Sequence, residues 1–583
     1  MSYQIFTYVQ NSLLPRIAAE IHHGAWRREL CAPRRRSRFA CENEKDCVEE
    51  FDFVIVGAGT AGCAVACRLA ERGNTVCVLE AGPPDRNPLI RIPSGIMKTS
   101  TNADLTWRYE FEPSENTKNR PIPGFFGKTL GGSSAIHGMV YNRGQRSDFD
   151  GWAAGGAEGW DYFSVLPYFR RSERYLDGGE DEFRGRDGPI PIAKLRMQEQ
   201  LSDRFINSAA ATGIPLTDDY NGRKQEGVSY VQAQIHNGRR WSSAHGYLHP
   251  ARRKFKVDVR THALARRVLT KDGRAIGVEY GAWEADDLKT VFARKSTIVS
   301  AGALVTPKIL QLSGIGPAKL LQQMGISVVR DLRGVGANMT DHFSARMVAR
   351  VKPGLGTINE RAKGWPLAVE IAKWLMGRPS VLAMTAMSVF AFCKSDPSSR
   401  DTEYSLMFLP ASLKSGMTRR LDDYPGVTGG VWQQRPDSRG YVRIRSRDIR
   451  DPPIIQPNYL DAEIDRQVVI RAIRHLDRVF KTEPLASVIE EITLPVHACT
   501  TDDEWLDYVR GNGMGSYHPA GTCKMGSPTD PAAVVDPRLR VLGIRDLRVV
   551  DASIFPTQPS GNLNASVMMT AEKAADMILE DFG

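Results

Sequence analysis

Apolar residues form a short continuous run and then recur at helical spacing in the first well-patterned part of the chain. Phe53–Val56 is apolar at every position, which is typical of a strand buried on both faces of a sheet. Val65 and Leu69 then continue one apolar face until Gly73, where a helix is expected to end. A second apolar run covers Thr75–Leu79. The pattern predicts a strand–helix–strand unit.

Three glycines occupy the first turn of this unit, in the order G-x-G-x-x-G. Gly57 permits a tight turn, Gly59 lets the backbone approach a pyrophosphate, and Gly62 lets the helix pack against the strand. Glu80 ends the second strand, where its carboxylate can accept the hydroxyls of an unphosphorylated adenosine ribose. Because strand, glycines, helix, strand and acid occur in order, the sequence predicts a dinucleotide site.

Two later glycine-rich stretches imitate part of this motif. GIGPAK (314–319) and GVGANM (334–339) lack the third glycine and the following acid. We therefore expect one dinucleotide rather than two. The longest other apolar stretch, 380–392, is too short to span a bilayer and indicates a buried strand or helix.

Length and composition narrow the class of protein. A chain of 583 residues is too long for one simple core, and 42% apolar with 25% charged residues is typical of a soluble globular protein. The net charge of +10 is modest for this length, and the arginines are scattered rather than clustered with aromatic residues. Nucleic acid is therefore not an expected partner. A mild attraction to anionic surfaces stays open.

The nine cysteines show no framework spacing, so we interpret them as reduced. The first fifty residues are unusual, because an arginine-rich segment (26–40) is followed by an acidic one (41–50). A targeting segment, a mobile tail and an upstream start site are all compatible with this pattern, whereas a secretory signal would need an apolar region. We expect a cytoplasmic or membrane-peripheral protein.

The stretch SYHPAGTCKMG (516–526) brings chemically active side chains together. His518, Cys523 and Met525 could share a soft metal, and His518 could also be the base of a nucleophile or a packed loop histidine. No other cysteine with ligand spacing lies nearby, so we expect no metal site.

Further motifs follow in order along the chain. GKTLGGSSAIHGMVYNRGQRSDFDGW (127–152) offers small residues and free backbone N–H groups to a flat ligand or its phosphates. SAGALVTPKILQLSGIG (300–316) predicts a strand end and a helix that begins near Thr306–Pro307. With the C-terminal stretches 435–460 and 547–578, the chain from about residue 51 onwards resembles the glucose–methanol–choline (GMC) family of FAD-dependent oxidoreductases. Its pattern is most similar to the choline dehydrogenase-like members.

The resemblance implies an α/β fold with a Rossmann-like FAD-binding domain built from separated segments. An α+β substrate domain containing an antiparallel sheet is inserted between those segments. The expected boundaries are an N-terminal extension over 1–50, an FAD-binding domain over 51–147, 220–340 and 510–583, and a substrate domain over 148–219 and 341–509.

The resemblance also implies two reactive positions and a set of cofactor contacts. His518 is expected to face the reactive edge of the flavin as the general base, and Asn562 to hydrogen-bond the developing alkoxide. Ala265 would contact adenine through its backbone. The expected FAD contacts are Gly57, Gly59, Thr60, Ala61, Gly62, Glu80, Ala81, Gly131, Gly132, Ser133, His137, Gly138, Met139, Val140, Ala265, Asp551, Ala552, Asn562 and Asn564.

The mode of FAD attachment depends on the serine-rich motif GGSSAIHG. Some family members attach FAD through a histidine there, and that position corresponds to Ile136 in this chain. We therefore expect non-covalent FAD. His137 would lie beside the isoalloxazine, with a packing role as an equal alternative.

These inferences predict that the chain oxidises a primary alcohol to the aldehyde by hydride transfer to flavin N5. The same fold also serves cyanohydrin lyases and fatty-acid photodecarboxylases, which are the alternative, and a non-catalytic flavoprotein is disfavoured. The electron acceptor, oxygen or a quinone, stays open. Trp365, Trp374 and Trp432 either line the substrate cavity or pack elsewhere, and the amphipathic segment 365–377 either touches a membrane or packs on its own domain.

Overall fold

Two sheets organise the chain in the computed structural model, which describes residues 49–583 except 196, 198, 286 and 415–419. The first sheet has the order β11-β2-β1-β14-β13-β12, with β25 also paired to β14. Its parallel part contains β1, β2, β11, β14 and β25, and β12 and β13 extend it antiparallel. Its strands are β1 (Glu50–Val56), β2 (Val76–Leu79), β11 (Val257–Arg260), β12 (Leu264–Lys271), β13 (Arg274–Gly281), β14 (Lys289–Val299) and β25 (Leu547–Val549).

The predicted strand–helix–strand unit forms the centre of this sheet. Helix α3 (Thr60–Glu71) joins β1 to β2 and buries Val65 and Leu69, as the apolar spacing predicts. The C-terminal helix α15 (Asn564–Phe582) packs beside α3. Gly62 makes the close packing of α3 possible, because a Cβ there would lie 1.9 Å from the carbonyl oxygen of Gly57.

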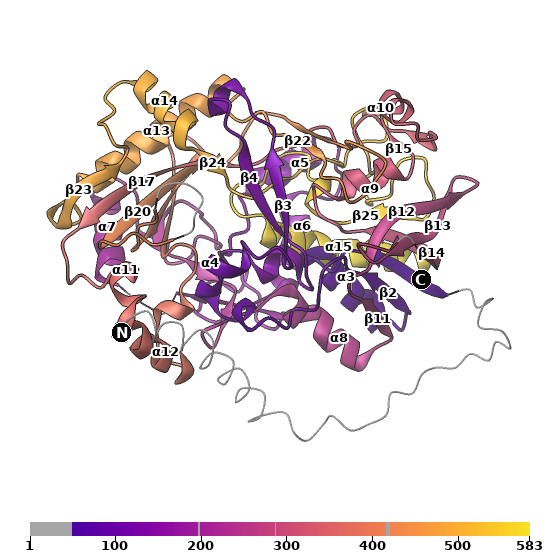
Figure 1. The fold of residues 1–583 in the computed structure, drawn as a ribbon, viewed down its shortest axis with the longest axis horizontal. Coiled ribbons are helices and arrows are strands. Elements are labelled where there is room, and N and C mark those ends of the chain that lie inside the picture. The colour runs from indigo at the N-terminus through magenta and orange to yellow at the C-terminus, as the bar shows by residue number, and fades with distance from the viewer. Residues whose placement is uncertain (1–48, 196, 198, 286, 415–419) are drawn as a thin grey trace.

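The second sheet is antiparallel and has the order β23-β17-β20-β19-β18-β7, with β24 paired to β17. It lies to the left of the first sheet in Figure 1, and α13 (Glu463–Phe480) packs against it. Its strands are β7 (Gly227–Tyr230), β17 (Phe343–Val351), β18 (Val389–Cys393), β19 (Tyr404–Leu409), β20 (Gly426–Gln433), β23 (Ile489–Leu494) and β24 (Met514–Gly515). The predicted fold class, a Rossmann-like unit with an inserted antiparallel sheet, is confirmed.

The expected boundaries between the two units differ in detail from the strand pairing. Strand β7 lies within the range 220–340 expected for the FAD-binding domain, yet it pairs with β18 of the second sheet. Helix α6 (Tyr162–Ser172) lies within the range 148–219 expected for the substrate domain, yet it packs against α15. The chain crosses between the units more often than the motifs indicate, because motifs mark local turns and not the partners of a strand. The other boundaries stay a prediction.

Smaller elements complete the fold. The remaining helices are α4 (Ile96–Thr99), α5 (Arg146–Ala154), α7 (Gln200–Ala211), α8 (His249–Lys254), α9 (Thr306–Leu312), α10 (Ala318–Gln323), α11 (Ile358–Arg361), α12 (Gly364–Leu375) and α14 (Asp502–Asn512). The remaining strands are β3 (Thr106–Phe111), β4 (Ile122–Gly127), β5 (Glu173–Tyr175), β6 (Ile190–Lys194), β8 (Gln232–Ala233), β9 (Ile235–His236), β10 (Arg239–Arg240), β15 (Ile315–Gly316), β16 (Arg330–Asp331), β21 (Tyr441–Arg443) and β22 (Ile454–Gln456).

Several local predictions can be compared with these elements. Helix α9 begins at Thr306, as predicted, and the amphipathic segment forms α12. The stretch 380–392 contributes a short 3-10 turn and most of β18, so it is a buried strand in its second half. In the described part of the chain, Cys63, Cys67 and Cys77 are free and buried. Among the described helices, none combines the length and the apolar character needed to cross a bilayer. The expected targeting segment, mobile tail or start-site extension lies almost entirely outside the described residues.

Candidate active site

A cavity of about 1010 Å³ is lined by elements of both sheets. One end is formed by the carboxyl ends of β1 and β2 and by the amino-terminal end of α3. The other end is formed by one face of β17, β19 and β20. In open parallel sheets, ligands bind at the carboxyl ends of strands, so the first end suits a nucleotide. The second end leaves room for another molecule.

Most residues that the sequence predicts to contact the cofactor line this cavity. They are Gly57, Gly59, Thr60, Ala61, Glu80, Ala81, Gly132, Ser133, His137, Gly138, Met139, Val140, Ala265, Asp551, Ala552, Asn562 and Asn564. The two exceptions are Gly62 and Gly131, which are not among the lining residues. Gly62 packs against Gly57, and the Gly131 N–H donates to the carbonyl of Ala58 at 2.8 Å. Both glycines therefore stabilise the backbone turns of the site without lining the cavity themselves.

The amino-terminal turn of α3 leaves open space where a pyrophosphate is expected. A Cβ placed on Gly59 would meet only the carbonyl oxygen of Ser300, at 4.0 Å, so the space on that side of the Gly59 Cα is open. A helix amino terminus also offers N–H groups without helical partners, and its dipole favours an anion. Gly59 therefore fits the close approach that a phosphate requires.

Glu80 lies fully buried at the end of β2. Its carboxylate oxygens accept hydrogen bonds from the backbone N–H of Ala58 at 3.0 Å and of Gly82 at 2.9 Å. Burial raises the pKa of Glu80 to about 7, although these hydrogen bonds act in the opposite direction. Each oxygen keeps a second lone pair, so the carboxylate can still accept from hydroxyls in the cavity.

Asp551 and Asn564 hold neighbouring segments at the same end of the cavity. Asp551 accepts from the backbone N–H of Gly302 at 2.8 Å and from the Thr306 hydroxyl at 2.6 Å. Burial raises the pKa of Asp551. The side-chain oxygen of Asn564 accepts from the Thr60 hydroxyl at 2.8 Å, which ties the start of α15 to the start of α3.

His137 presents an unpartnered polar atom beside the cavity. Its Nδ1 accepts from the backbone N–H of Met139 at 3.0 Å and lies 3.2 Å from Nη1 of Arg240, which can only donate. The proton is therefore assigned to Nε2. This buried nitrogen has no hydrogen-bond partner among the described residues, and burial lowers the pKa of His137 to about 3. A cofactor acceptor would satisfy it.

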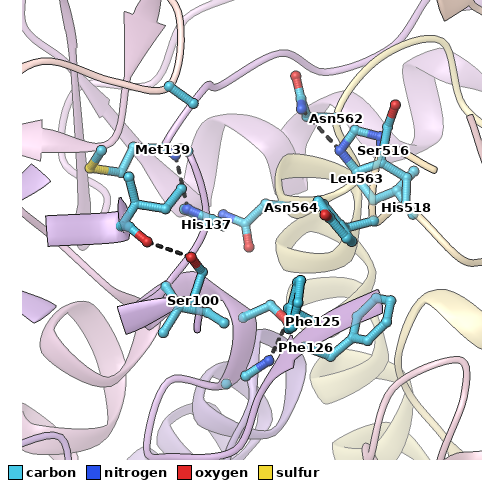
Figure 2. A pocket seen from close by; sticks show the side chains of 18 of the residues that line it. Ser100, Phe125, Phe126, His137, Met139, Ser516, His518, Asn562, Leu563 and Asn564 are labelled. Carbon is cyan, nitrogen blue, oxygen red and sulfur yellow. Dashed lines mark hydrogen bonds between the residues drawn. The ribbon is translucent and has the colours of Figure 1, made fainter. Parts of the chain in front are cut away.

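His518 and Asn562, the two predicted reactive residues, meet in the cavity. The Asn562 side-chain nitrogen lies 3.0 Å from Nε2 of His518, as the dashed line in Figure 2 shows. The Asn562 side-chain oxygen accepts from Asn142 at 3.1 Å, so the amide turns its NH₂ group toward the histidine. Burial, with smaller contributions from His342 and His137, holds the pKa of His518 well below its usual value. His518 is therefore an uncharged imidazole.

His342 determines which nitrogen of His518 carries the proton. Its Nε2 lies 2.9 Å from the carbonyl oxygen of Gln434, so this nitrogen donates. Burial lowers the pKa of His342 to about 4, so the ring is neutral and its Nδ1 is an acceptor. Nδ1 of His518 lies 3.0 Å from this acceptor and must donate to it. Nε2 of His518 therefore carries the lone pair of the ring, which accepts from the Asn562 NH₂ group at 3.0 Å.

Asp341 and Gln558 complete the support of the His518 loop. Asp341 accepts from the backbone N–H of His518 at 2.8 Å, and Gln558 donates to the His518 carbonyl at 3.0 Å. The sequence reasoning missed His342, Asp341 and Gln558. GVGANM was set aside for lacking nucleotide features, although the Thr-Asp-His that follows it was a usable signal of polar residues entering an apolar strand.

The three candidate wall tryptophans have different positions. Trp432 lines the cavity and stacks on His342, with ring centroids 5.5 Å apart. Trp374 instead donates to the carbonyl of Gly238 at 2.8 Å, and Trp365 is exposed at the surface. The last two are not among the residues that line the cavity.

The metal ligands considered in the sequence, His518, Cys523 and Met525, are not the residues that the structure groups at metal-ligand distances. Cys523 and Met525 are buried in the core of the first unit. Among the described residues, the group with metal-ligand spacing is Asp85, His245 and His249. Asp85 accepts from His249 at 2.9 Å, and Arg91 contacts His245, so hydrogen bonds and charge account for this cluster.

Comparison with known proteins identifies the family of this chain. Family models described as GMC oxidoreductase match residues 51–344 and 436–571. An oxygen-dependent choline dehydrogenase of Rhizobium johnstonii is 39% identical over 91% of this chain and 95% of its own length. One from Vibrio vulnificus is 38% identical over 91% and 94%.

Two solved structures of oxidases resemble this chain in fold. Pyridoxine 4-oxidase from Mesorbium loti has a TM-score of 0.81 and 29% identity, covering 90% of this chain and 98% of that one. An Aspergillus oryzae formate oxidase, solved to study FAD modification, has a TM-score of 0.83 and 28% identity, covering 92% and 99%. The chain belongs to the GMC oxidoreductase family. It is an FAD-dependent oxidoreductase that acts on CH–OH donors.

Proposed function

We propose that this protein oxidises a primary alcohol to the aldehyde, with His518 as the general base. One observation carries the proposal. The unprotonated Nε2 of His518 and the NH₂ group of Asn562 lie 3.0 Å apart in a cavity whose other end suits a nucleotide. FAD, when bound, supplies the acceptor for the hydride at N5.

The proton steps follow from the hydrogen-bond directions. An alcohol oxygen held beside this pair gives its proton to Nε2 of His518, which is neutral because it is buried. Asn562 donates to the same oxygen as it gains negative charge. His342 accepts from Nδ1 of His518 throughout, so the imidazolium that forms keeps its position.

We also propose that FAD is held without a covalent bond. The nucleotide end of the cavity would be held by the glycine turn, Glu80 and Asp551, and the ring system would approach His137. Ile136, at the position of the attachment histidine, lines the cavity with an apolar side chain that forms no such bond. Acid precipitation should therefore release the yellow cofactor into the supernatant, and a yellow pellet would contradict this.

The lining of the substrate end favours an uncharged apolar alcohol over choline. Among the described residues that line the cavity, the carboxylates are Glu80 and Asp551, and both lie at the nucleotide end. A quaternary ammonium is held by aromatic faces and negative charge. The substrate end presents aromatic side chains, among them Trp432, Phe125 and Phe126, but the charged residues there are the cations Arg346 and Arg420. Its apolar lining includes Met384, Met387, Met407, Leu382, Leu409 and Leu413.

The first test follows the flavin itself. Purified yellow protein is mixed without oxygen with aliphatic, aromatic and choline-type alcohols, and bleaching of the flavin absorbance is recorded. We expect apolar primary alcohols to bleach it faster than choline does. The rate of recovery in air then separates oxygen from a quinone or another acceptor. If FAD is bound and no alcohol bleaches it, alcohol oxidation is contradicted, and a cyanohydrin lyase or a photodecarboxylase becomes the better supported function.

A substitution tests the role of the base. His518→Ala should slow flavin reduction by roughly a hundredfold to ten-thousandfold while FAD stays bound, because a positioned general base contributes about that much. His497→Ala is the control, since His497 is exposed at the surface. Reduction of the His518→Ala protein at the rate of the control would remove His518 from the mechanism.

A further inference from the structure

Helix α12 carries an unpartnered apolar face at the edge of the molecule (Figure 1). Trp365 is 80% exposed, Met376 62%, Leu375 46% and Val369 37%. These residues, called the apolar stripe below, stand at positions i, i+4, i+10 and i+11, so they share one side of the helix and the turn after it. Scattered exposed apolar residues are ordinary, but a continuous exposed face marks an interaction surface.

The exposed charged residues at the two ends of α12 are cations. The acid within α12, Glu370, is buried and accepts from Arg361 and Lys373 at 2.8 Å each. Lys363 and Arg378 are exposed at the two ends of the helix. A neighbouring exposed acid, Asp423, is paired with Lys414 at 2.7 Å.

A further cation lies on the side of the helix. The Arg239 guanidinium lies 5.4 Å from the ring centre of Trp374, where its charge is close to the aromatic face. The surface of this region is therefore apolar with a cationic rim formed by the exposed Lys363 and Arg378 and the half-buried Arg239. An anionic partner with an apolar interior matches that arrangement.

The other side of the same helix region lines the active-site cavity. Leu367 of α12, Ile358 of α11 and Ala362 between the two helices are among the lining residues, in the same cavity as His518. The helix therefore stands between the cavity and the surface. Whatever the stripe contacts is next to the wall of the active site.

We propose that α12 docks on an anionic lipid surface. The apolar stripe enters the boundary between headgroups and acyl chains, and the cationic rim lies at the phosphates. This is the behaviour of an interfacial helix, which binds through buried apolar area and attraction to anionic lipids. An apolar substrate dissolved in the lipid then reaches the cavity past α12.

A second copy of this chain fits the surface less well. A twofold dimer brings the same patch of both copies together, so the cationic rims would face each other. Like charges at close range oppose that contact. A lipid surface meets both the apolar stripe and the rim without this cost.

The test measures lipid binding and needs no turnover, so its result is separate from that of the proposed reaction. Full-length protein is sedimented with vesicles of phosphatidylcholine alone and with vesicles that also contain phosphatidylglycerol. We expect the protein to bind the anionic vesicles. The double substitution Trp365→Ser with Met376→Ser should weaken binding by about tenfold or more. Lys363→Glu with Arg378→Glu should weaken it on anionic vesicles.

The matched control is Val496→Ser, since Val496 is 74% exposed but follows β23 at another edge of the fold. It should bind as the unchanged protein does. Flavin absorbance and melting temperature verify that each variant is folded, because the substituted side chains are exposed. Failure of the unchanged protein to sediment with anionic vesicles would overturn the proposal, as would full binding by the stripe variant. A concentration-dependent dimer that the stripe variant abolishes, without vesicle binding, would overturn it in favour of a second copy.

Discussion

His518 is partly enclosed in the cavity wall, and each of its ring nitrogens has a hydrogen-bond partner. Burial disfavours the imidazolium, and the nearby His342 and His137 add to this effect. A base that reacts in its neutral form is therefore available at lower pH than a histidine in water, whose pKa is near 6.5. A low pKa makes His518 a weak base, but proton acceptance is compatible with it because departure of a hydride from the adjacent carbon makes the alcohol hydroxyl much more acidic.

The sign of the pH dependence follows directly. In the proposed mechanism the neutral form of His518 is the active one, and its pKa lies below the usual value, so activity should be lost only as pH falls through that lowered pKa. The rate of anaerobic flavin reduction should stay flat from about pH 8 to about pH 6. A stopped-flow series at saturating alcohol measures it. A fall centred on the usual histidine pKa would show that the burial effect is absent in solution.

His342 can be tested as a positioning residue for the base. His342→Leu removes the acceptor for Nδ1–H of His518, so the proton is no longer confined to that nitrogen. We expect flavin reduction to slow by about tenfold to a hundredfold. His342→Gln retains a side-chain carbonyl that can accept the same proton and should recover part of the rate. Equal rates in the two variants would indicate a packing role instead.

At the scale of elements, the turn between β1 and α3 depends on glycine for a steric reason. An added Cβ on Gly62 would lie 1.9 Å from the carbonyl oxygen of Gly57, so strand and helix would have to separate. Gly62→Ala should therefore lower FAD occupancy and the melting temperature. The ratio of flavin to protein absorbance measures the first effect.

The chain offers a matched control for that substitution. Gly151 also lies in a helix, α5, but an added Cβ there meets nothing within 4 Å. Gly151→Ala should leave FAD occupancy unchanged and stabilise the fold by up to about 1 kcal/mol, because alanine favours the helix. If both variants bind FAD equally well, the close approach at Gly62 does not govern the site.

For the whole molecule, Asp148 links segments that are distant in the sequence. Its buried carboxylate accepts from the Arg435 guanidinium at 2.6 Å and from the backbone N–H and hydroxyl of Ser560 at 2.8 and 2.9 Å. Arg435 follows β20 of the second sheet, and Ser560 stands two positions before Asn562. Asp148 therefore joins the second sheet to the reactive loop.

Asp148→Asn should affect stability and rate together. The amide carries no charge and accepts through one oxygen, so we expect a loss of roughly 2–4 kcal/mol and a lower melting temperature. Flavin reduction should also slow because the Asn562 loop loses its anchor. Asp507→Asn serves for comparison, since the Asp507–Lys118 pair is exposed and worth at most about 1 kcal/mol. An Asp148→Asn protein that melts and reacts like this control would show that the link is dispensable.

The prediction of the fold was most accurate where the pattern was local. The unit from Phe53 to Glu80 could be predicted because strand, turn, helix and acid follow one another. The assignment of β7 to the first unit differed from the structure, because its partner β18 begins far along the chain. The resemblance to a family placed His518 and Asn562 in one site, but it indicated nothing of His342.

The sequence by itself determined the dinucleotide-binding unit and the family, and the family resemblance pointed to His518 and Asn562 as the proposed reactive pair. The unit could be predicted because its motif is contiguous and its local geometry follows from glycine freedom and apolar spacing. Only the tertiary structure decided the tautomer of His518, the apolar lining beside it and the exposure of α12. His342 and His518 are 176 positions apart, and Asn142 and Asn562 are 420 apart. Hydrogen bonds over such separations form only when the two sheets pack together. A local sequence pattern therefore cannot predict which distant side chains will meet.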